Sequence, residues 1–96
     1  MNFNINFNSS TGGVVVITIP NPAADITHTS SQSCRSCVVQ QYSGTQVYMN
    51  INTAATASSA SWKLSTTSPI AVSIDDVQKL HFIGTAGDVI QIMWRN

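Results

Sequence analysis

The chain has 96 residues, of which 43% are hydrophobic and only 8% are charged, and its formal net charge is zero. This content of apolar residues excludes a generally disordered chain. The absence of any basic cluster argues against a nucleic-acid partner, because affinity for phosphates depends on grouped lysine and arginine side chains. The chain is near the lower size limit for a self-sufficient core, so we expect self-association, which zero net charge does not oppose.

The first residues show a two-residue repeat in which apolar side chains alternate with asparagine, at Phe3, Ile5 and Phe7. This repeat is typical of a strand. The small residues 9–13 that follow predict a flexible joint, so we predict that residues 1–13 are an N-terminal strand or arm with a glycine hinge, and that residues 14–96 are the folded domain. The arm either folds back as an ordinary first strand or extends the sheet of a neighbouring copy. No secretory signal and no membrane partner are expected, since the start lacks a basic segment and a continuous apolar stretch.

Residues 14–19 are apolar on both faces, which predicts a strand that is covered on two sides and ended by Pro20. A polar loop is expected from 21 to 33. Residues 37–42 and 45–51 are then predicted to form a hairpin around Ser43-Gly44.

Small residues from 53 to 61 favour a loop, with a short strand following at Trp62 and Leu64. A proline-led strand is predicted over 70–74, and Asp75-Asp76 is expected to open a single helical turn. Residues 80–83 and 89–95 are predicted to form the last hairpin. In its second arm one face holds Ile90, Ile92 and Trp94, and the other holds Gln91, Met93 and Arg95.

About seven to eight short strands predict an all-β fold, a single small antiparallel β-sandwich, with a barrel as the alternative.

Cys34 and Cys37 form a C-x-x-C spacing, and His28 is the nearest further candidate for a metal ligand. A structural zinc site needs four ligands, and no second matched pair is present. A redox role would need the pair at the start of a helix, whereas here it leads into a strand. We therefore interpret Cys37 as a small core residue and Cys34 as a loop residue, and we expect no metal and no other cofactor.

We expect no enzymatic activity, because no arrangement of reactive residues stands out. The nucleophile motif G-x-S-x-G is absent. His81 lies between Leu80 and Phe82 and should point away from the face that they cover. The adjacent carboxylates Asp75 and Asp76 suit capping better than hydrolysis, which needs two carboxylates facing each other across a substrate.

Partner binding is assigned to the arm residues Phe3, Ile5 and Phe7 together with two aromatic residues, Trp62 and Tyr48. Trp62 follows a loop of small residues, which favours a place at a subunit contact. Flat aromatic rings can alternatively stack on sugars, whereas Trp94 is expected in the core because it shares a face with Ile90 and Ile92.

Three stretches resemble a group of small bacteriophage proteins, the head-decoration or capsid cement proteins and related virion β-sandwich modules. The stretches are residues 38–48 (VVQQYSGTQVY), 68–77 (SPIAVSIDDV) and 80–89 (LHFIGTAGDV). The resemblance implies a homo-oligomer, with a trimer favoured, that is assembled in a host cytoplasm and clamps the major capsid protein on the outside of the virion. The alternative is a module of a head or tail fibre that recognises host glycans.

Overall fold

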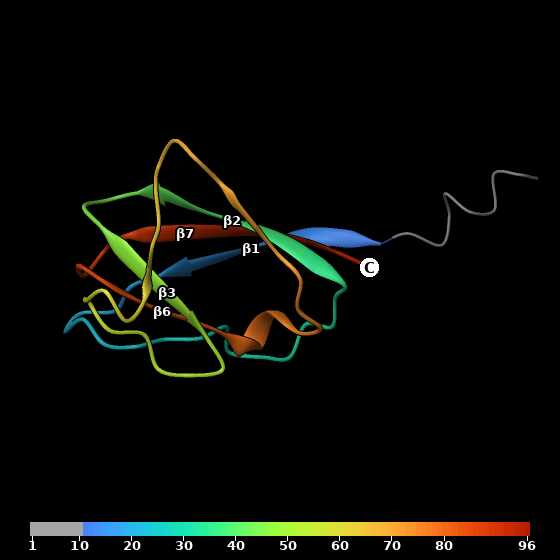
Figure 1. Ribbon diagram of the computed structural model, residues 1–96, viewed down its shortest axis with the longest axis horizontal. Helices are drawn as coiled ribbons and strands as arrows, with labels where there is room; N and C mark the ends of the chain where they lie inside the picture. Colours follow the sequence, from blue (N-terminus) through green and yellow to red (C-terminus); the bar gives the residue numbers. More distant parts are fainter. Residues whose placement is uncertain (1–10) are drawn as a thin grey trace, which may run out of the picture.

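Alternating apolar and polar residues give most strands of this chain one buried face, and two sheets bring these faces together. The computed structural model describes residues 11–96. They form a four-stranded sheet with the order β1-β7-β2-β5 and a three-stranded sheet with the order β4-β3-β6, both antiparallel (Figure 1). The elements are β1 (Gly12–Thr18), β2 (Ser36–Ser43), β3 (Val47–Ile51), β4 (Trp62–Lys63), β5 (Ile70–Val72), the 3-10 turn η1 (Val77–Lys79), β6 (Leu80–Gly84) and β7 (Val89–Arg95). The predicted all-β sandwich is confirmed.

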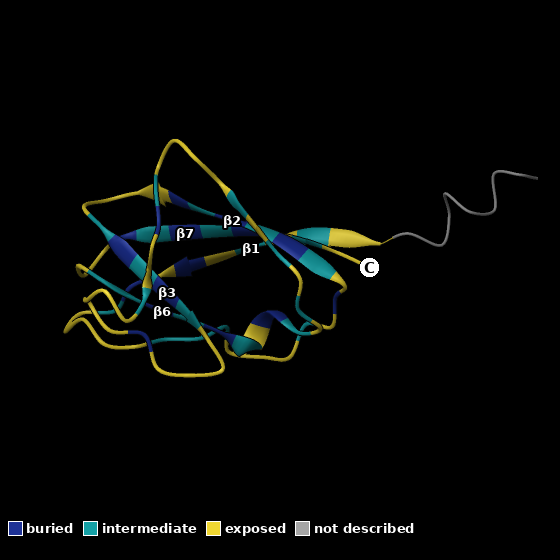
Figure 2. Ribbon diagram, viewed as in Figure 1, coloured by how far each residue is buried: buried dark blue, intermediate teal, exposed yellow. Residues whose placement is uncertain are grey.

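The core lies between the two sheets. Figure 2 shows buried residues alternating with less buried ones along β2, β3 and β7, as expected where one face of a strand meets the opposite sheet. The four-stranded sheet contributes Val39, Ile90 and Ile92, and the three-stranded sheet contributes Met49 and Phe82. Trp94 packs against this cluster and is only partly buried. No helix among residues 11–96 has the length and apolar character needed to cross a membrane.

Both predicted hairpins are wrong, because in each case the two strands belong to different sheets. β2 pairs with β5 and β7, whereas β3 pairs with β4 and β6. Likewise, β6 pairs with β3, whereas β7 pairs with β1 and β2. The chain therefore crosses from one sheet to the other at residues 44–46 and again at residues 85–88.

The buried carboxylate of Asp88 holds both of these crossings. Its oxygens accept hydrogen bonds from the backbone N–H groups of Thr45 at 2.9 Å, Gln46 at 3.2 Å and Thr85 at 3.0 Å. Gly44 has a φ of 109°, and any side chain there would collide with the carboxylate. Because the donors come from both crossings, the side chain of Asp88 ties the two segments together.

Strand β1 begins at Gly12, so the two glycines predicted as a hinge are instead paired with β7. A Cβ atom on Gly12 would lie 2.7 Å from the carbonyl oxygen of Trp94, and one on Gly13 would lie 3.2 Å from its indole ring. Glycine is therefore required at position 12 for the close approach of the two strands, whereas a side chain at position 13 would need the indole ring of Trp94 to shift. The prediction that β1 is covered on both faces is also wrong, because the side chains of Val14 and Val16 are exposed.

The short elements agree better with expectation. The strand predicted after Pro69 is present as β5, and Asp76 caps η1 by accepting a hydrogen bond from the backbone N–H of Gln78 at 2.8 Å. A hydrogen bond from Ser31 and the one from Gln78 lower the pKa of Asp76. Asp75 does not cap; it forms an ion pair with Lys79 at 2.6 Å, which lowers the pKa of Asp75.

The polar segment between β1 and β2 covers the outer edge of β6. The N–H of Ile26 donates to the carbonyl oxygen of Phe82 at 2.8 Å, and the N–H of Phe82 donates back to Ile26 at 2.9 Å. Farther along, Ser33 forms an isolated bridge with Asp76. The chain's own backbone therefore occupies the β6 edge of the three-stranded sheet at Phe82.

Candidate functional site

The outer face of the four-stranded sheet, which points away from the core, carries exposed apolar side chains on adjacent strands. Val14 and Val16 of β1 are 60% and 59% exposed, and Met93 of β7 is 57% exposed. Contiguous apolar side chains at the surface of a small protein are typical of an interaction site. We refer to the residues Val14, Val16, Val38, Gln40, Gln91 and Met93 as the outer face.

The strand register arranges the outer face in two cross-strand rows. In the first row Met93 lies between Val14 of β1 and Val38 of β2. In the second row Gln91 lies between Val16 and Gln40. The side-chain amide nitrogen of Gln40 donates a hydrogen bond to the side-chain oxygen of Gln91 at 2.8 Å, so these two polar groups are paired with each other within the sheet.

Two shallow hollows lie on either side of Met93. The first, of about 340 Å³, is lined by the first row together with residues at the Gly12 end of β1, the Ser36 end of β2 and the Arg95 end of β7. The second, of about 300 Å³, is lined by Gln40, Gln91 and Pro69 in addition to the first row. An exposed methionine with a hollow on each side is suited to contact with a complementary protein surface, since the methionine side chain adapts its shape to irregular gaps.

Charge is almost absent from this region. Arg95, at one end of β7, is the only charged residue in the four strands of the sheet. A surface of this kind gives little attraction to phosphates, and it loses little solvation energy when another uncharged surface covers it. The outer face therefore combines exposed apolar side chains with very little charge.

The predicted partner-binding residues are spread over different parts of the chain. Phe3, Ile5 and Phe7 lie outside the residues that the structure describes. Tyr48, the second residue of β3, is half-buried and pairs with Lys63 of the edge strand β4.

Trp62 is 60% exposed and borders a separate hollow of about 580 Å³. This hollow lies between β3 and β5 and combines apolar residues with hydroxyl and amide groups, which come from Asn50, Ser59, Ser61 and Ser73. An exposed indole beside hydrogen-bonding groups is able to stack on a flat polar ligand. Trp62 thus belongs to a different surface from the outer face, and its predicted place at a subunit contact stays a prediction.

Both cysteines are buried and neither forms a disulfide. Cys37 lies in the core as a strand residue, and Cys34 lies in a loop but is also part of the core, where its thiol donates a hydrogen bond to the carbonyl oxygen of Ile74 at 3.3 Å. Burial, and to a smaller degree Cys34, raises the pKa of Cys37 to about 11, and burial also raises the pKa of Cys34. At neutral pH both groups are therefore neutral thiols, which are poor nucleophiles and poor metal ligands.

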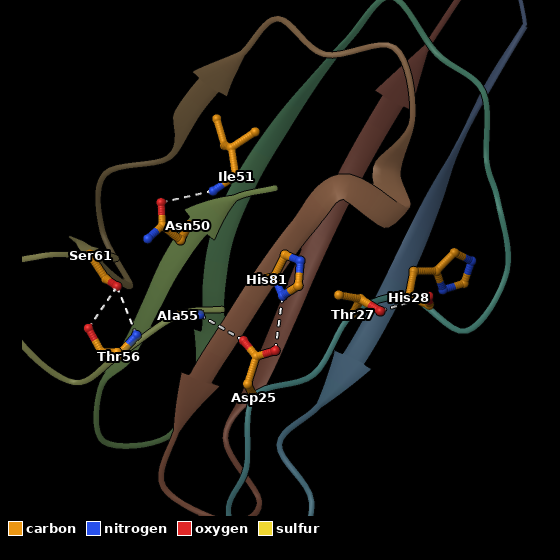
Figure 3. Close-up of polar contacts among 9 residues, drawn as sticks. All are labelled: Asp25, Thr27, His28, Asn50, Ile51, Ala55, Thr56, Ser61 and His81. Carbon is orange, nitrogen blue, oxygen red and sulfur yellow. Dashed lines mark hydrogen bonds and ion pairs between the residues drawn. The ribbon is translucent and has the colours of Figure 1, made fainter. Parts of the chain in front are cut away.

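Within residues 11–96, no group of three or more histidine, cysteine, aspartate or glutamate side chains is placed to hold a metal ion. His28 lies in the segment that covers β6, where its carbonyl oxygen accepts a hydrogen bond from the Thr27 hydroxyl. Figure 3 shows the ring of His28 turned away from the nearby pair formed by Asp25 and His81.

His81 and Asp25 form a polar contact outside the core. The Nδ1 atom of His81 lies 2.9 Å from one carboxylate oxygen of Asp25, and the other oxygen accepts a hydrogen bond from the N–H of Ala55 at 2.8 Å (Figure 3). Both neighbours of His81 in β6 are fully buried, so its side chain points away from the core, as predicted. No serine or threonine hydroxyl of the described residues is hydrogen-bonded to His81, and the pair serves to hold two loops against β6.

Sequence reasoning missed the outer face as a site. The continuous apolar run of β1 predicts a strand that is covered on two sides. A strand that binds a partner on one face can have the same apolar sequence, so the pattern does not distinguish the two cases. The alternation of side chains in β7 did indicate an exposed apolar residue, because Met93 lies on the opposite face of the strand from its buried neighbour Ile92.

Fold and surface together define a small antiparallel β-sandwich with one uncharged, partly apolar outer face. Comparisons of the chain with models of protein families, with curated proteins and with solved structures gave no match.

Proposed function

We propose that this protein is a structural decoration module of a bacteriophage capsid, which self-associates and clamps the major capsid protein on the outside of the head. The observation that carries the proposal is the uncharged outer face, with Val14, Val16 and Met93 exposed on adjacent strands. The resemblance of residues 38–48, 68–77 and 80–89 to capsid cement proteins supports the choice of partner. The role is non-catalytic, acting by contact alone.

The physical mechanism is selective binding to the assembled shell. A protein that covers neighbouring shell subunits binds the intact lattice and not the free subunits, so it stabilises the lattice by mass action. Burial of apolar side chains such as Met93 supplies the favourable free energy, at about 25 cal/mol for each Å² removed from water. The low charge of the outer face keeps the desolvation cost small.

Met93→Lys is expected to weaken binding to the shell about tenfold or more, because the variant places a charge where an apolar side chain would be buried. Met93 lies on a central strand and is exposed, so the fold should tolerate lysine. Binding is measured by co-sedimentation with shells assembled from the cognate major capsid protein without this chain. Thr66→Lys, at an exposed position outside the strands, adds the same charge as a control and should bind like the wild type. Equal binding by Met93→Lys and the wild type would contradict a shell contact through this face.

The second candidate function is recognition of host glycans by a fibre module, and the hollow beside Trp62 favours it. Trp62→Ala would remove the exposed indole and should abolish any binding seen on a glycan array, because stacking on a flat ring supplies much of the affinity for a sugar face. Tyr42→Ala, which removes another exposed aromatic side chain away from this hollow, is the matched control. A wild-type protein that binds no glycan on the array rules this function out.

A further inference from the structure

Strand β1 has one paired edge and one open edge. It lies at the end of the four-stranded sheet, and within residues 11–96 its only partner strand is β7. The open edge presents a row of backbone N–H and C=O groups that another strand is able to pair with.

The hydrogen bonds at the two ends of β1 show which residues face the open edge. Beyond one end, the N–H of Ile19 donates to the carbonyl oxygen of Asp88 at 2.8 Å, and beyond the other, the N–H of Asn96 donates to Thr11 at 2.9 Å. Residues in an antiparallel pair alternate between those that bond to the partner and those that do not. The odd-numbered residues of β1 therefore bond to β7. The even-numbered residues direct their backbone groups to the open edge, and they are Gly12, Val14, Val16 and Thr18.

The open edge lacks the features that normally prevent pairing. Gly12–Thr18 contains no proline, no charged residue and no bulge, whereas exposed edges in monomers are usually short, charged or covered. The other edges of this sandwich follow that pattern. The β6 edge is covered at Ile26, β4 has two residues, and β5 has three residues and follows Pro69.

We propose that β1 pairs with β1 of a second copy, antiparallel, about a two-fold axis at Val15. This inference specifies how the self-association within the proposed function occurs. In this register Val14 lies opposite Val16 of the second copy, and Gly12 lies opposite Thr18 of the second copy. All of these are even-numbered residues, so each outward N–H and C=O group meets a partner of the correct kind.

Side chains and charges suit the same arrangement. Val14 and Val16 point to the outer face, so the pairing places valine beside valine across the junction and joins the outer faces of the two copies. Arg95 pairs with Gly12 at one end of β1, and the two-fold axis places the two copies of Arg95 at opposite ends of the joined sheet. No like charges meet at the junction. The two-fold axis gives a dimer, not the trimer that the resemblance implies.

The first test is the mass of the full chain in solution, measured by sedimentation equilibrium. The wild type should have twice the mass of one 10.3 kDa chain. Val16→Pro should shift the protein to a monomer, because proline removes an N–H group that faces the open edge and leaves the hydrogen bonds to β7 in place. Met93→Lys alters the same face on a central strand, and it should remain a dimer. A wild-type monomer, or an oligomer that Val16→Pro does not change, would overturn the proposal.

The second test determines the register and does not depend on whether the proline variant folds. Val14→Cys and Val16→Cys proteins are mixed under mild oxidation, and a disulfide should join one to the other because these positions lie opposite each other. Each variant alone should crosslink at least several-fold less. The native cysteines are buried and contribute little to this reaction. Equal crosslinking in all three samples would show that the register is wrong.

A third measurement separates the second copy from the chain's own N-terminal residues as the occupant of the edge. Deletion of residues 1–8 should leave the dimer unchanged. A protein that becomes a dimer only after this deletion would show that its own N-terminal residues cover β1, and the proposal would fail. A wild-type monomer that still binds capsid shells overturns the edge pairing and the self-association but leaves the shell contact standing, whereas a dimer without affinity for shells overturns the decoration function and leaves the edge pairing standing.

Discussion

Replacing Asp88 by alanine is expected to lower the free energy of unfolding by about 3 to 5 kcal/mol, because three backbone N–H groups lose their acceptor at once. The carboxylate is 2% exposed, so water reaches these donors only if the chain crossings rearrange. The donors belong to Thr45, Gln46 and Thr85, which lie on the crossings between β2 and β3 and between β6 and β7. The loss should therefore loosen both connections between the sheets, and urea denaturation followed by tryptophan fluorescence measures it.

Asp88→Asn is the matched control, because it keeps the shape of the side chain and one acceptor oxygen. We expect it to retain part of the stability, with a loss of about 1 to 3 kcal/mol. If Asp88→Ala unfolds at the same urea concentration as the wild type, the carboxylate does not hold the crossings. The slope of the free energy against urea should stay the same in all three proteins, which shows that the folded and unfolded states are comparable.

Phe82→Ala should lower the free energy of unfolding by about 3 to 5 kcal/mol, because truncation of a fully buried aromatic ring leaves a cavity between the sheets. Phe82 is among the largest fully buried side chains of the protein, and it lies in the central part of β6. A domain of this size has a total stability of about 5 to 15 kcal/mol, so the variant should be close to unfolding at room temperature. Calorimetry should show a melting temperature lower by about 12 °C or more.

The neighbouring residue provides the control for this effect. Ile83 lies next to Phe82 on the opposite, half-buried face of β6, so Ile83→Ala removes apolar atoms outside the core. Its loss should be clearly smaller than that of Phe82→Ala. Phe82→Leu should cost less than Phe82→Ala, since leucine fills part of the cavity. Equal melting temperatures for the alanine variants at 82 and 83 would contradict this placement of the core.

The outer face and the β1 edge act together if both proposals hold. Pairing of β1 across the two-fold axis places the first cross-strand row of each copy in line with the second row of the other, and the two outer faces become one surface with a Met93 in each half. A dimer then offers the shell two copies of the same contact, and the second contact forms at a high effective concentration. Met93→Lys and Val16→Pro separate the two properties, because the first alters the shell contact and the second alters the pairing.

Local patterns in the sequence were sufficient for most of the strands and for the cap of η1. Alternation placed Ile90 and Ile92 together on one face of a strand and His81 away from the face of Leu80 and Phe82, because the side chains of a strand alternate between its two faces whatever the partner strand is. The cap at Asp76 was equally predictable, because capping depends on a side chain and the backbone two residues later.

The tertiary structure alone decided which strands pair and which surface remains open. The pattern in residues 37–51 is the same for a hairpin and for two strands that face each other across a core. In the structure these two strands belong to different sheets, and Asp88, which is distant in sequence, accepts hydrogen bonds from Thr45 and Gln46 at the crossing between them. Likewise, the apolar run of β1 does not reveal whether a second layer covers both of its faces. Strand order and edge position depend on contacts between residues far apart in the chain, so they are absent from any local pattern.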